Sequence, residues 1–191
     1  MRLILASQSP RRQQLLQLLR VPFTVCPADI DEGMDPNLPP QEEVARVSRL
    51  KALATPCQKG DVVIAADTIV VLEDRVLGKP GNKEEAVGML ECLSGRAHQV
   101  MTGLTVLRDG RSITHTEITD VQFRPLTQEE ILSYVETGEP MDKAGAYGIQ
   151  GFAAPFVEGI RGDYYNVMGL PVCRLQQLLR QIAPTYMEEF Q

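Results

Sequence analysis

The stretch LILASQSPRR at residues 3–12 decides how the fold begins, because an apolar run changes there into a helix start. Residues 3–6 predict a short buried strand. Ser9 followed by Pro10 predicts the first turn of a helix, since a hydroxyl caps free backbone N–H groups and proline suits the first helical position. The apolar face of this helix is then expected from leucines at residues 15, 16, 18 and 19. The chain is therefore expected to open with a strand that leads directly into a helix.

Two arginines fall in the first turn of this predicted helix. Arg11 and Arg12 lie beside unpaired N–H groups and the positive end of the helix dipole, where a cation costs about 0.3–1 kcal/mol. A bound phosphate would make the position of these cations favourable, because helix N termini and arginines both attract anions. Solvated surface arginines are the alternative interpretation. The strand, cap and helix context favours a phosphate site.

Helices and strands alternate through the rest of the chain. Apolar runs predict strands at residues 22–26, 61–72, 97–107, 111–123 and 155–160. Asp109-Gly110 predicts a hairpin turn. Helical patterns cover residues 40–54, 82–95, 127–138 and 171–182. We expect an α/β fold in a single domain, residues 1–191, with a central mixed, twisted β-sheet flanked by helices and a substrate cleft.

Composition indicates a small cytoplasmic enzyme. No apolar run approaches the ~18 residues needed to span a bilayer, and strand residues begin too early for a signal peptide. The net charge of −6 argues against nucleic acid and anionic membrane as partners. Four widely spaced cysteines, at residues 26, 57, 92 and 173, predict free and mostly buried thiols.

Three polar side chains stand where the local pattern favours apolar ones. Asp67 interrupts a strand of Val, Ile and Ala, where an unpaired carboxylate would cost several kcal/mol. Lys51 lies on the apolar stripe of its helix, although a snorkelling lysine would fit the same pattern. Lys79 follows the hairpin that begins with Asp67, where an ordinary turn lysine is the alternative. Asp67 must therefore meet a cation, a metal or a cleft.

An acidic loop supplies further oxygen ligands. Asp29, Asp31, Glu32 and Asp35 are of the kind that Mg²⁺ uses together with substrate phosphates, although solvated loop acids are common. Carboxylates surrounded by Arg and Lys are what phosphoanhydride cleavage requires, because cations neutralise the charge on the phosphoryl oxygens. The sequence has no Gly-x-x-x-x-Gly-Lys-Ser/Thr loop, which excludes P-loop chemistry.

Several segments, in order along nearly the whole chain, resemble the Maf family of nucleoside triphosphate pyrophosphatases. They are Ser7-x-Ser9-Pro10-Arg11-Arg12, Asp31-Glu32, Lys51-Ala52, Ala66-Asp67-Thr68-Ile69-Val70, Gly78-Lys79-Pro80, Leu93-Ser94-Gly95 and residues 142–151, DKAGAYGIQG. Each segment alone would be a weak signal, but the ordered set is specific. The resemblance implies a Maf/ITPase-like fold and hydrolysis of a nucleoside triphosphate between the α and β phosphates, with Mg²⁺ or Mn²⁺ as the divalent cation.

The resemblance also implies roles for individual residues. Asp67 matches the proton-accepting aspartate of the family, and Glu32, Lys51 and Lys79 match its other polar active-site positions. Glu32 and Asp67 are the expected metal ligands. Substrate binding is expected from Ser7, Arg11, Arg12, Thr68 and Gln150. The Gln150 amide could pair with the O4 and N3–H edge of thymine or uracil.

The segment at residues 142–151 resembles the branch that acts on dTTP and UTP. Two alternatives stay open. One is the branch of the family that acts on 7-methyl-GTP, although that site would favour an added aromatic residue and this chain has no tryptophan. The other is a nucleotide-sensing regulator of septum formation, which would not need the acid at Asp67. The sequence also leaves open whether the protein is a monomer or a homodimer.

Overall fold

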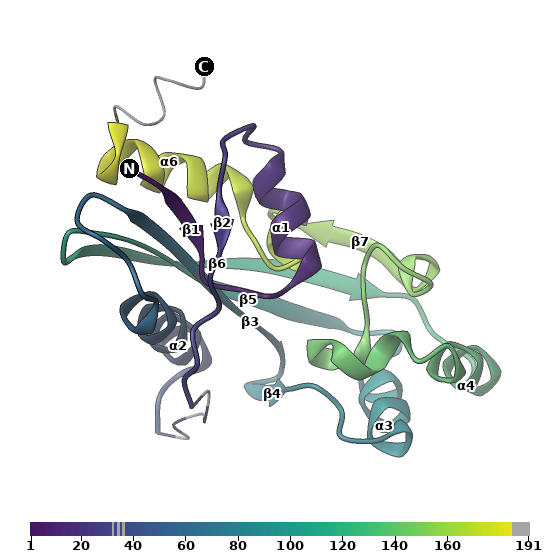
Figure 1. Cartoon of the computed structure of the whole chain (residues 1–191). Coiled ribbons are helices and arrows are strands. Elements are labelled where there is room, and N and C mark those ends of the chain that lie inside the picture. The colour runs from purple at the N-terminus through teal and green to yellow at the C-terminus, as the bar shows by residue number, and fades with distance from the viewer. Residues whose placement is uncertain (32, 34, 36, 185–191) are drawn as a thin grey trace. The chain divides into compact units, whose positions relative to one another are not determined.

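The computed structural model describes residues 1–31, 33, 35 and 37–184 (Figure 1). By its contacts the chain forms two compact units. The first contains residues 1–67, 102–117 and those from 169 onward, and the second contains residues 68–101 and 118–168. A single domain over residues 1–191 stays a prediction.

Seven strands form a mixed sheet in the order β2-β1-β3-β5-β6-β7, with β4 paired to β3. They are β1 (Leu3–Leu5), β2 (Thr24–Val25), β3 (Val62–Leu72), β4 (Arg75–Leu77), β5 (Ala97–Arg108), β6 (Arg111–Phe123) and β7 (Val157–Arg161). Strand β1 is parallel to both β2 and β3, whereas β4 and β7 run antiparallel to β3 and β6. The predicted α/β class and mixed sheet are confirmed.

The helices of the described residues are α1 (Pro10–Gln17), α2 (Pro40–Ala54), α3 (Lys83–Leu93), α4 (Gln128–Glu136), α5 (Tyr164–Val167) and α6 (Val172–Ile182). Helices α1, α3 and α4 follow side-chain caps at the residues where the sequence predicts a helix to start, Ser9, Asn82 and Thr127. The Ser9 hydroxyl accepts a hydrogen bond from the Arg12 N–H at 3.5 Å, and Thr127 forms a reciprocal capping box with Glu130. These caps satisfy N–H groups that the first helical turn leaves free.

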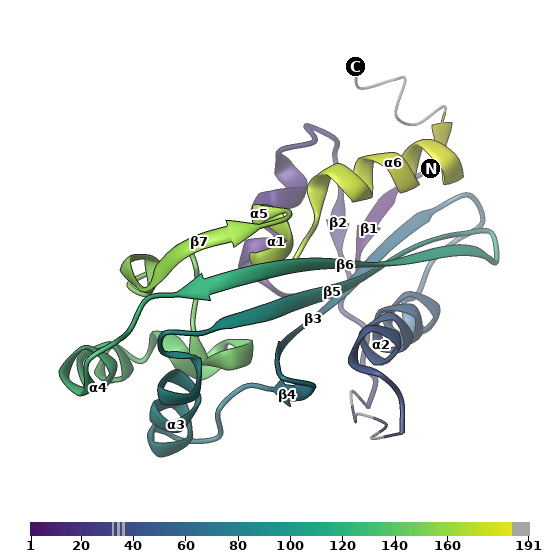
Figure 2. The ribbon, with the colours of Figure 1, turned by 180° about the vertical axis from the view of Figure 1, so that it is seen from behind.

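In the first unit, helices lie on both faces of strands β1 and β3. Ile4 and Ala6 alternate with Leu3 and Leu5, so the two pairs of side chains point to opposite faces. Ile4 and Ala6 pack in one buried cluster with Ala52 of α2. Figures 1 and 2 both show α2 on one side of these strands, with α1 and α6 on the other.

Helix α2 approaches strand β5 very closely at Gly103. A Cβ atom at Gly103 would lie 2.2 Å from the Val44 carbonyl oxygen, so only glycine fits there without a shift. Next to this contact, the Ser48 hydroxyl lies 2.8 Å from that of Thr105, which in turn lies 2.9 Å from the Thr114 hydroxyl. These contacts fix the position of α2 along and above the sheet.

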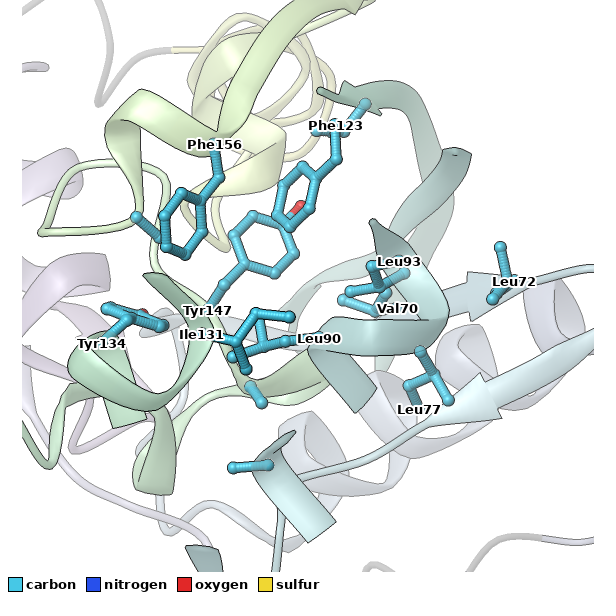
Figure 3. Packing of buried hydrophobic residues seen from close by; sticks show 14 of the residues in the cluster. Val70, Leu72, Leu77, Leu90, Leu93, Phe123, Ile131, Tyr134, Tyr147 and Phe156 are labelled. Atoms are coloured by element: carbon cyan, nitrogen blue, oxygen red, sulfur yellow. The ribbon is translucent and has the colours of Figure 1, made fainter. Parts of the chain in front are cut away.

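The second unit has its own core, which is rich in aromatic side chains (Figure 3). The Phe123 ring packs edge-to-face on Tyr147 at 4.8 Å, and Tyr134 packs in the same way on Phe156 at 5.3 Å. His98 is buried beside them, with Nε2 2.8 Å from the Tyr147 hydroxyl. Burial lowers the pKa of His98 to about 4, so the ring is neutral at pH 7.

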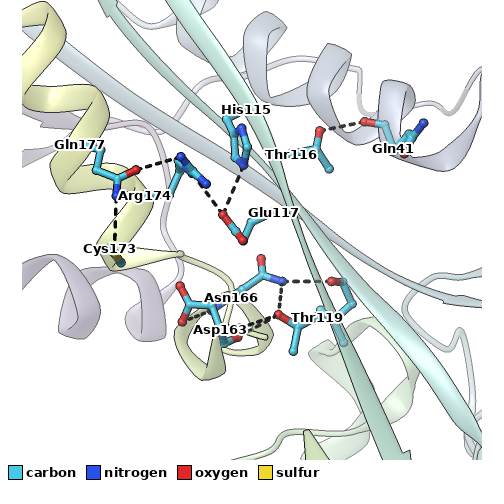
Figure 4. Close-up of polar contacts among 11 residues, drawn as sticks. Gln41, His115, Thr116, Glu117, Thr119, Asp163, Asn166, Cys173, Arg174 and Gln177 are labelled. Carbon is cyan, nitrogen blue, oxygen red and sulfur yellow. Dashed lines mark hydrogen bonds and ion pairs between the residues drawn. The ribbon is translucent and has the colours of Figure 1, made fainter. Parts of the chain in front are cut away.

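Polar residues of β6 hold neighbouring elements in place (Figure 4). Within the first unit, the Glu117 carboxylate accepts from Arg174 of α6 at 3.3 Å. Within the second unit, Thr119 donates to the Asp163 carbonyl at 3.0 Å and accepts from the Asn166 amide at 3.0 Å. Asp163 in turn caps α5. These hydrogen bonds hold the short helix α5 against strand β6.

Three details differ from the sequence-based expectations. Leu18 was expected on the apolar face of α1 but is exposed, because the regular helix ends at Gln17. The cysteines are free as predicted, but Cys57, Cys92 and Cys173 are exposed, so the expected burial is wrong. Helix α5 and the short 3-10 turns Glu139–Asp142, Ala144–Ala146 and Ala154–Phe156 were not predicted, because three or four residues are too few to show a helical period.

Candidate active site

An ion pair between helix α2 and strand β3 is the centre of the candidate site. The Lys51 Nζ atom lies 2.8 Å from Asp67 Oδ1, and the side chains are only 9% and 17% exposed. Removing either partner would leave the other charge with little solvent, which is costly. The structure therefore brings together two residues that the sequence singled out separately.

The local sequence explains why this pair forms. Lys51 follows Val44 and Val47 on the buried stripe of α2, so its side chain points toward the sheet. Asp67 lies in the middle of β3, where Ala66 before it and Ile69 after it are buried. The snorkelling alternative for Lys51 is excluded, because its ammonium is buried with a carboxylate instead of reaching water.

A second cluster forms at the start of α1. The Arg12 Nε atom donates to the Gly169 carbonyl at 2.8 Å, and Arg12 Nη1 donates to the Ser7 hydroxyl at 3.3 Å. The same hydroxyl accepts from the Ser9 N–H at 3.2 Å. A guanidinium is planar and its donors point in fixed directions, so these bonds orient the group. The half-buried Arg11 lies beside it in the same turn.

Strand register relates the two clusters within the first unit. Leu5 of β1 is paired with Ile64 of β3 in a parallel ladder, and the Ala6 N–H donates to the Ile64 carbonyl at 2.8 Å. Continuing this register by two residues places Ser7 level with Ala66, one residue before Asp67. Ligands commonly bind at the carboxyl ends of parallel strands. The cluster at the start of α1 lies at that end of β1, and the Lys51–Asp67 pair lies level with it in the middle of β3.

The acidic loop is only partly described. Glu32 lies outside the described residues, so its expected place in the site stays a prediction. In the described part, Asp31 accepts from the Gly33 N–H at 2.8 Å, and Glu43 of α2 pairs with Arg46. Hydrogen bonds from Arg46 lower the pKa of Glu43, and those from Asn37 lower the pKa of Asp35. Both carboxylates are therefore ionised at pH 7.

Among the described side chains, no group of three or more His, Cys, Asp and Glu residues could hold a metal ion. Asp67 contributes one carboxylate, of which Oδ1 meets Lys51. Mg²⁺ is commonly held by one or two carboxylates together with substrate phosphates and water. A carboxylate such as Asp67 fits that pattern, which does not require a complete cage of protein ligands.

The remaining predicted residues belong to the second unit. Thr68 follows Asp67 on β3 and is half-buried, Lys79 is exposed after β4, and Gln150 is exposed in the loop before β7. The Gly145 N–H donates to the Gly78 carbonyl at 3.0 Å, so the segment of Gln150 contacts the segment of Lys79. Their approach to the Lys51–Asp67 pair stays a prediction.

Sequence reasoning missed the Gly169 carbonyl and the residues that support the Gln150 loop. A backbone carbonyl has no sequence signature of its own. Only the glycine at position 169 could have indicated a special backbone conformation there, and its φ in the structure is +107°. Tyr134 falls within the helical pattern of residues 127–138, and Glu139 lies just after it. Glu139 accepts from both the Tyr134 hydroxyl and the Phe152 N–H.

The fold of this chain is shared with a protein of known structure. The structure of a HAM1 protein from Coxiella burnetii superposes with a TM-score of 0.50 over 95% of this chain and 99% of that chain, at 15% sequence identity. This likeness shows a shared α/β fold. In the described part of the chain, no helix is both long and apolar enough to cross a membrane.

Sequence comparison then gives the family. The Maf-like protein family matches residues 2–182, so this chain belongs to the Maf-like family. It is 52% identical over 179 residues to a dTTP/UTP pyrophosphatase of Halalkalibacterium halodurans, covering 93% of this chain and 94% of that protein. A dTTP/UTP pyrophosphatase of Symbiobacterium thermophilum is 51% identical over 182 residues, covering 95% and 94%.

Proposed function

We propose that this protein is a nucleoside triphosphate pyrophosphatase that hydrolyses dTTP and UTP to the monophosphate and pyrophosphate. The observation that carries the proposal is the buried Lys51–Asp67 pair at 2.8 Å, in a member of the Maf-like family. A binding protein would gain little from a carboxylate that repels phosphate, whereas a hydrolase needs a group that accepts a proton from water. Relatives about half identical over nearly the whole chain carry the same activity in their names.

In the proposed reaction, Asp67 accepts a proton from the water that attacks the α phosphorus. The new bond joins the water oxygen to that phosphorus, and the bond to the oxygen bridging the α and β phosphates breaks. Lys51 orients Asp67, because its ammonium donates to Oδ1. Pyrophosphate leaves with the bridging oxygen, and the nucleoside monophosphate keeps the oxygen from water.

Cations are proposed to hold the triphosphate during this step. Arg12 is preoriented by Ser7 and Gly169, and Arg11 and the N–H groups of the first turn of α1 lie beside it. Positive groups fixed before the reaction stabilise charge on phosphoryl oxygens without reorganisation. Lys79, which is exposed, is assigned to the same task.

A divalent cation, Mg²⁺ or Mn²⁺, is part of this proposal. Glu32 and Asp67 are the side chains assigned to hold it, together with phosphate oxygens of the substrate. When bound, such a cation neutralises phosphate charge and polarises the attacked phosphoryl group. Purified protein treated with EDTA is expected to lose pyrophosphate release and to regain it on addition of Mg²⁺ or Mn²⁺.

Base selectivity is assigned to Gln150, with Thr68 and Arg11 as the other residues that influence substrate choice. The side-chain amide of Gln150 has both a donor and an acceptor, which suits the O4 and N3–H edge shared by thymine and uracil. A cytoplasmic location stays a prediction, as does the choice between monomer and homodimer.

A screen of pyrophosphate release over common and modified nucleoside triphosphates, with Mg²⁺ or Mn²⁺, tests the proposal. We expect the highest kcat/KM for dTTP and UTP. A preference for 7-methyl-GTP would move the protein to the other branch of the family. Tight binding of nucleotides without hydrolysis of any of them would contradict an enzyme and support a sensor.

A further inference from the structure

The loop that carries Gln150 is fixed on both sides by one pair of side chains. Two residues before Gln150, the Gly148 N–H donates to the Tyr134 hydroxyl at 3.2 Å. Two residues after it, the Phe152 N–H donates to Glu139 Oε2 at 3.0 Å. The Tyr134 hydroxyl completes the chain by donating to Glu139 Oε1 at 3.0 Å. All of these residues belong to the second unit.

Glycine at position 151 lets the Glu139 carboxylate fit directly against the loop backbone. A Cβ atom at Gly151 would lie 2.1 Å from Glu139 Oε1. A Cβ atom at Gly148 would lie 2.7 Å from Lys143 Cε and 3.3 Å from Glu139 Oε1, so the Lys143 side chain packs closest there. The two glycines therefore leave room for side chains of the same unit that pack on the loop backbone.

The pair is itself anchored in the core of the second unit. Tyr134 is buried on α4, and its ring packs on Phe156 at 5.3 Å (Figure 3). Burial and the neighbouring Glu139 raise the pKa of Tyr134, so its hydroxyl stays a donor. On the other side, Lys143 donates to the Glu139 carbonyl at 2.6 Å. The loop backbone is thus tied to a rigid helix while Gln150 remains exposed.

We propose that Tyr134 and Glu139 are positioning residues for base recognition, which hold residues 148–152 so that Gln150 can meet the edge of a pyrimidine base. This inference rests on the proposed function, because it assigns selectivity within that activity. A base-edge hydrogen bond discriminates only when donor and acceptor are placed in advance. Tyr134 and Glu139 act through Gln150 and do not contact the phosphates in this account.

The test compares Tyr134→Phe with the matched control Tyr165→Phe, which removes the hydroxyl of an exposed tyrosine of the same unit. The readout is the ratio of kcat/KM for dTTP to that for dATP. We expect this ratio to fall about tenfold in Tyr134→Phe, as for loss of one base-edge hydrogen bond, mainly through KM for dTTP. The control should keep the wild-type ratio.

A double-mutant comparison separates positioning from general damage. In a Gln150→Ala background, Tyr134→Phe should change the ratio no further, because the group that it positions is already gone. Glu139→Ala should reproduce the loss, and Glu139→Gln should recover part of it, since one amide oxygen can still accept. An unchanged ratio in Tyr134→Phe and Glu139→Ala, or an equal fall with and without Gln150, would overturn the inference.

Hydrogen exchange gives a readout that does not depend on activity. The amides of Gly148 and Phe152 should exchange faster in Tyr134→Phe and Glu139→Ala, respectively, while amides of β5 keep their protection. Absence of pyrophosphate release from the wild-type protein would refute the proposed function. Wild-type selectivity that survives with these amides released would refute only the positioning role.

Discussion

Among the single side chains, Asp67 has the most demanding environment, because a carboxylate in the middle of a strand depends on one buried lysine. Asp67→Asn preserves the shape of the side chain, and its amide oxygen can still accept from Lys51. The amide cannot accept a proton from water. We therefore expect a folded protein whose kcat for pyrophosphate release falls about 10²- to 10⁴-fold.

The matched control for this variant is Asp74→Asn, in the exposed turn that follows the same strand. Asp74 has a φ of +66°, which asparagine also tolerates. Its kcat should equal that of the wild type. Near wild-type turnover in Asp67→Asn would remove Asp67 from its catalytic role.

Loss of a phosphate contact and loss of a base contact should have different effects on kcat/KM. Arg12→Ala should lower kcat/KM for every triphosphate by a similar factor, because the phosphates are common to all of them. Gln150→Ala should instead lower the dTTP to dATP ratio of kcat/KM by about tenfold or more. Equal losses on all nucleotides in Gln150→Ala would remove it from base selection.

Among the elements, helix α2 matters most for the site, since it carries Lys51 and packs its backbone on β5. Gly103→Ala would place a methyl group 2.2 Å from the Val44 carbonyl oxygen, so α2 must move. We expect a loss of about 1–3 kcal/mol in the free energy of unfolding, measured by urea denaturation. The shift of Lys51 away from Asp67 should also lower kcat.

Gly88, unlike Gly103, has room for a side chain. It lies inside α3, and a Cβ atom there would meet no heavy atom within 4 Å. Gly88→Ala should therefore raise the free energy of unfolding by about 0.5–1 kcal/mol, because alanine loses less backbone entropy in a helix. If both variants changed stability equally, close packing at Gly103 would not position α2.

The Asp61 carboxylate, just before β3, pairs with Arg2, just before β1, and the stability of this contact depends on pH. Asp61 accepts from the Arg2 side chain at 2.6 Å and from the Gln58 N–H at 2.9 Å, which lowers its pKa to about 2. The ionised form therefore stabilises the folded protein above about pH 4, and this stabilisation is lost as pH falls toward about 2. The stability difference between wild type and Asp61→Asn should shrink over that range.

Unfolding by urea at several pH values measures this difference, with the exposed Asp74→Asn as the control. The control should follow the wild-type curve at every pH. A difference between wild type and Asp61→Asn that stays constant from pH 7 to about pH 2 would show that the hydrogen bonds of Asp61 do not depend on its charge.

Over the whole molecule, local patterns predicted the longer strands and helices, because β3, β5 and β6 are long apolar runs and α1, α3 and α4 begin at capping residues. Asp67 and Lys51 could be predicted for the same reason, since each breaks a regular apolar pattern in its own element. The Gly169 carbonyl that orients Arg12 could not, because it comes from a segment 157 residues away in sequence and any residue has a carbonyl. The contacts of Glu139 could not be predicted either, because it lies after the helical pattern, and its partners, the Tyr134 hydroxyl and the Phe152 N–H, carry no sequence signal that links them to it.

The position of the attack on the triphosphate tests the proposed activity most directly. Hydrolysis of dTTP in water labelled with heavy oxygen, followed by mass spectrometry of both products, identifies the phosphorus that water attacks. We predict one labelled oxygen in dTMP, unlabelled pyrophosphate and no dTDP at early times. Label in pyrophosphate, or dTDP formed before dTMP, would contradict attack at the α phosphorus and with it the proposed pyrophosphatase.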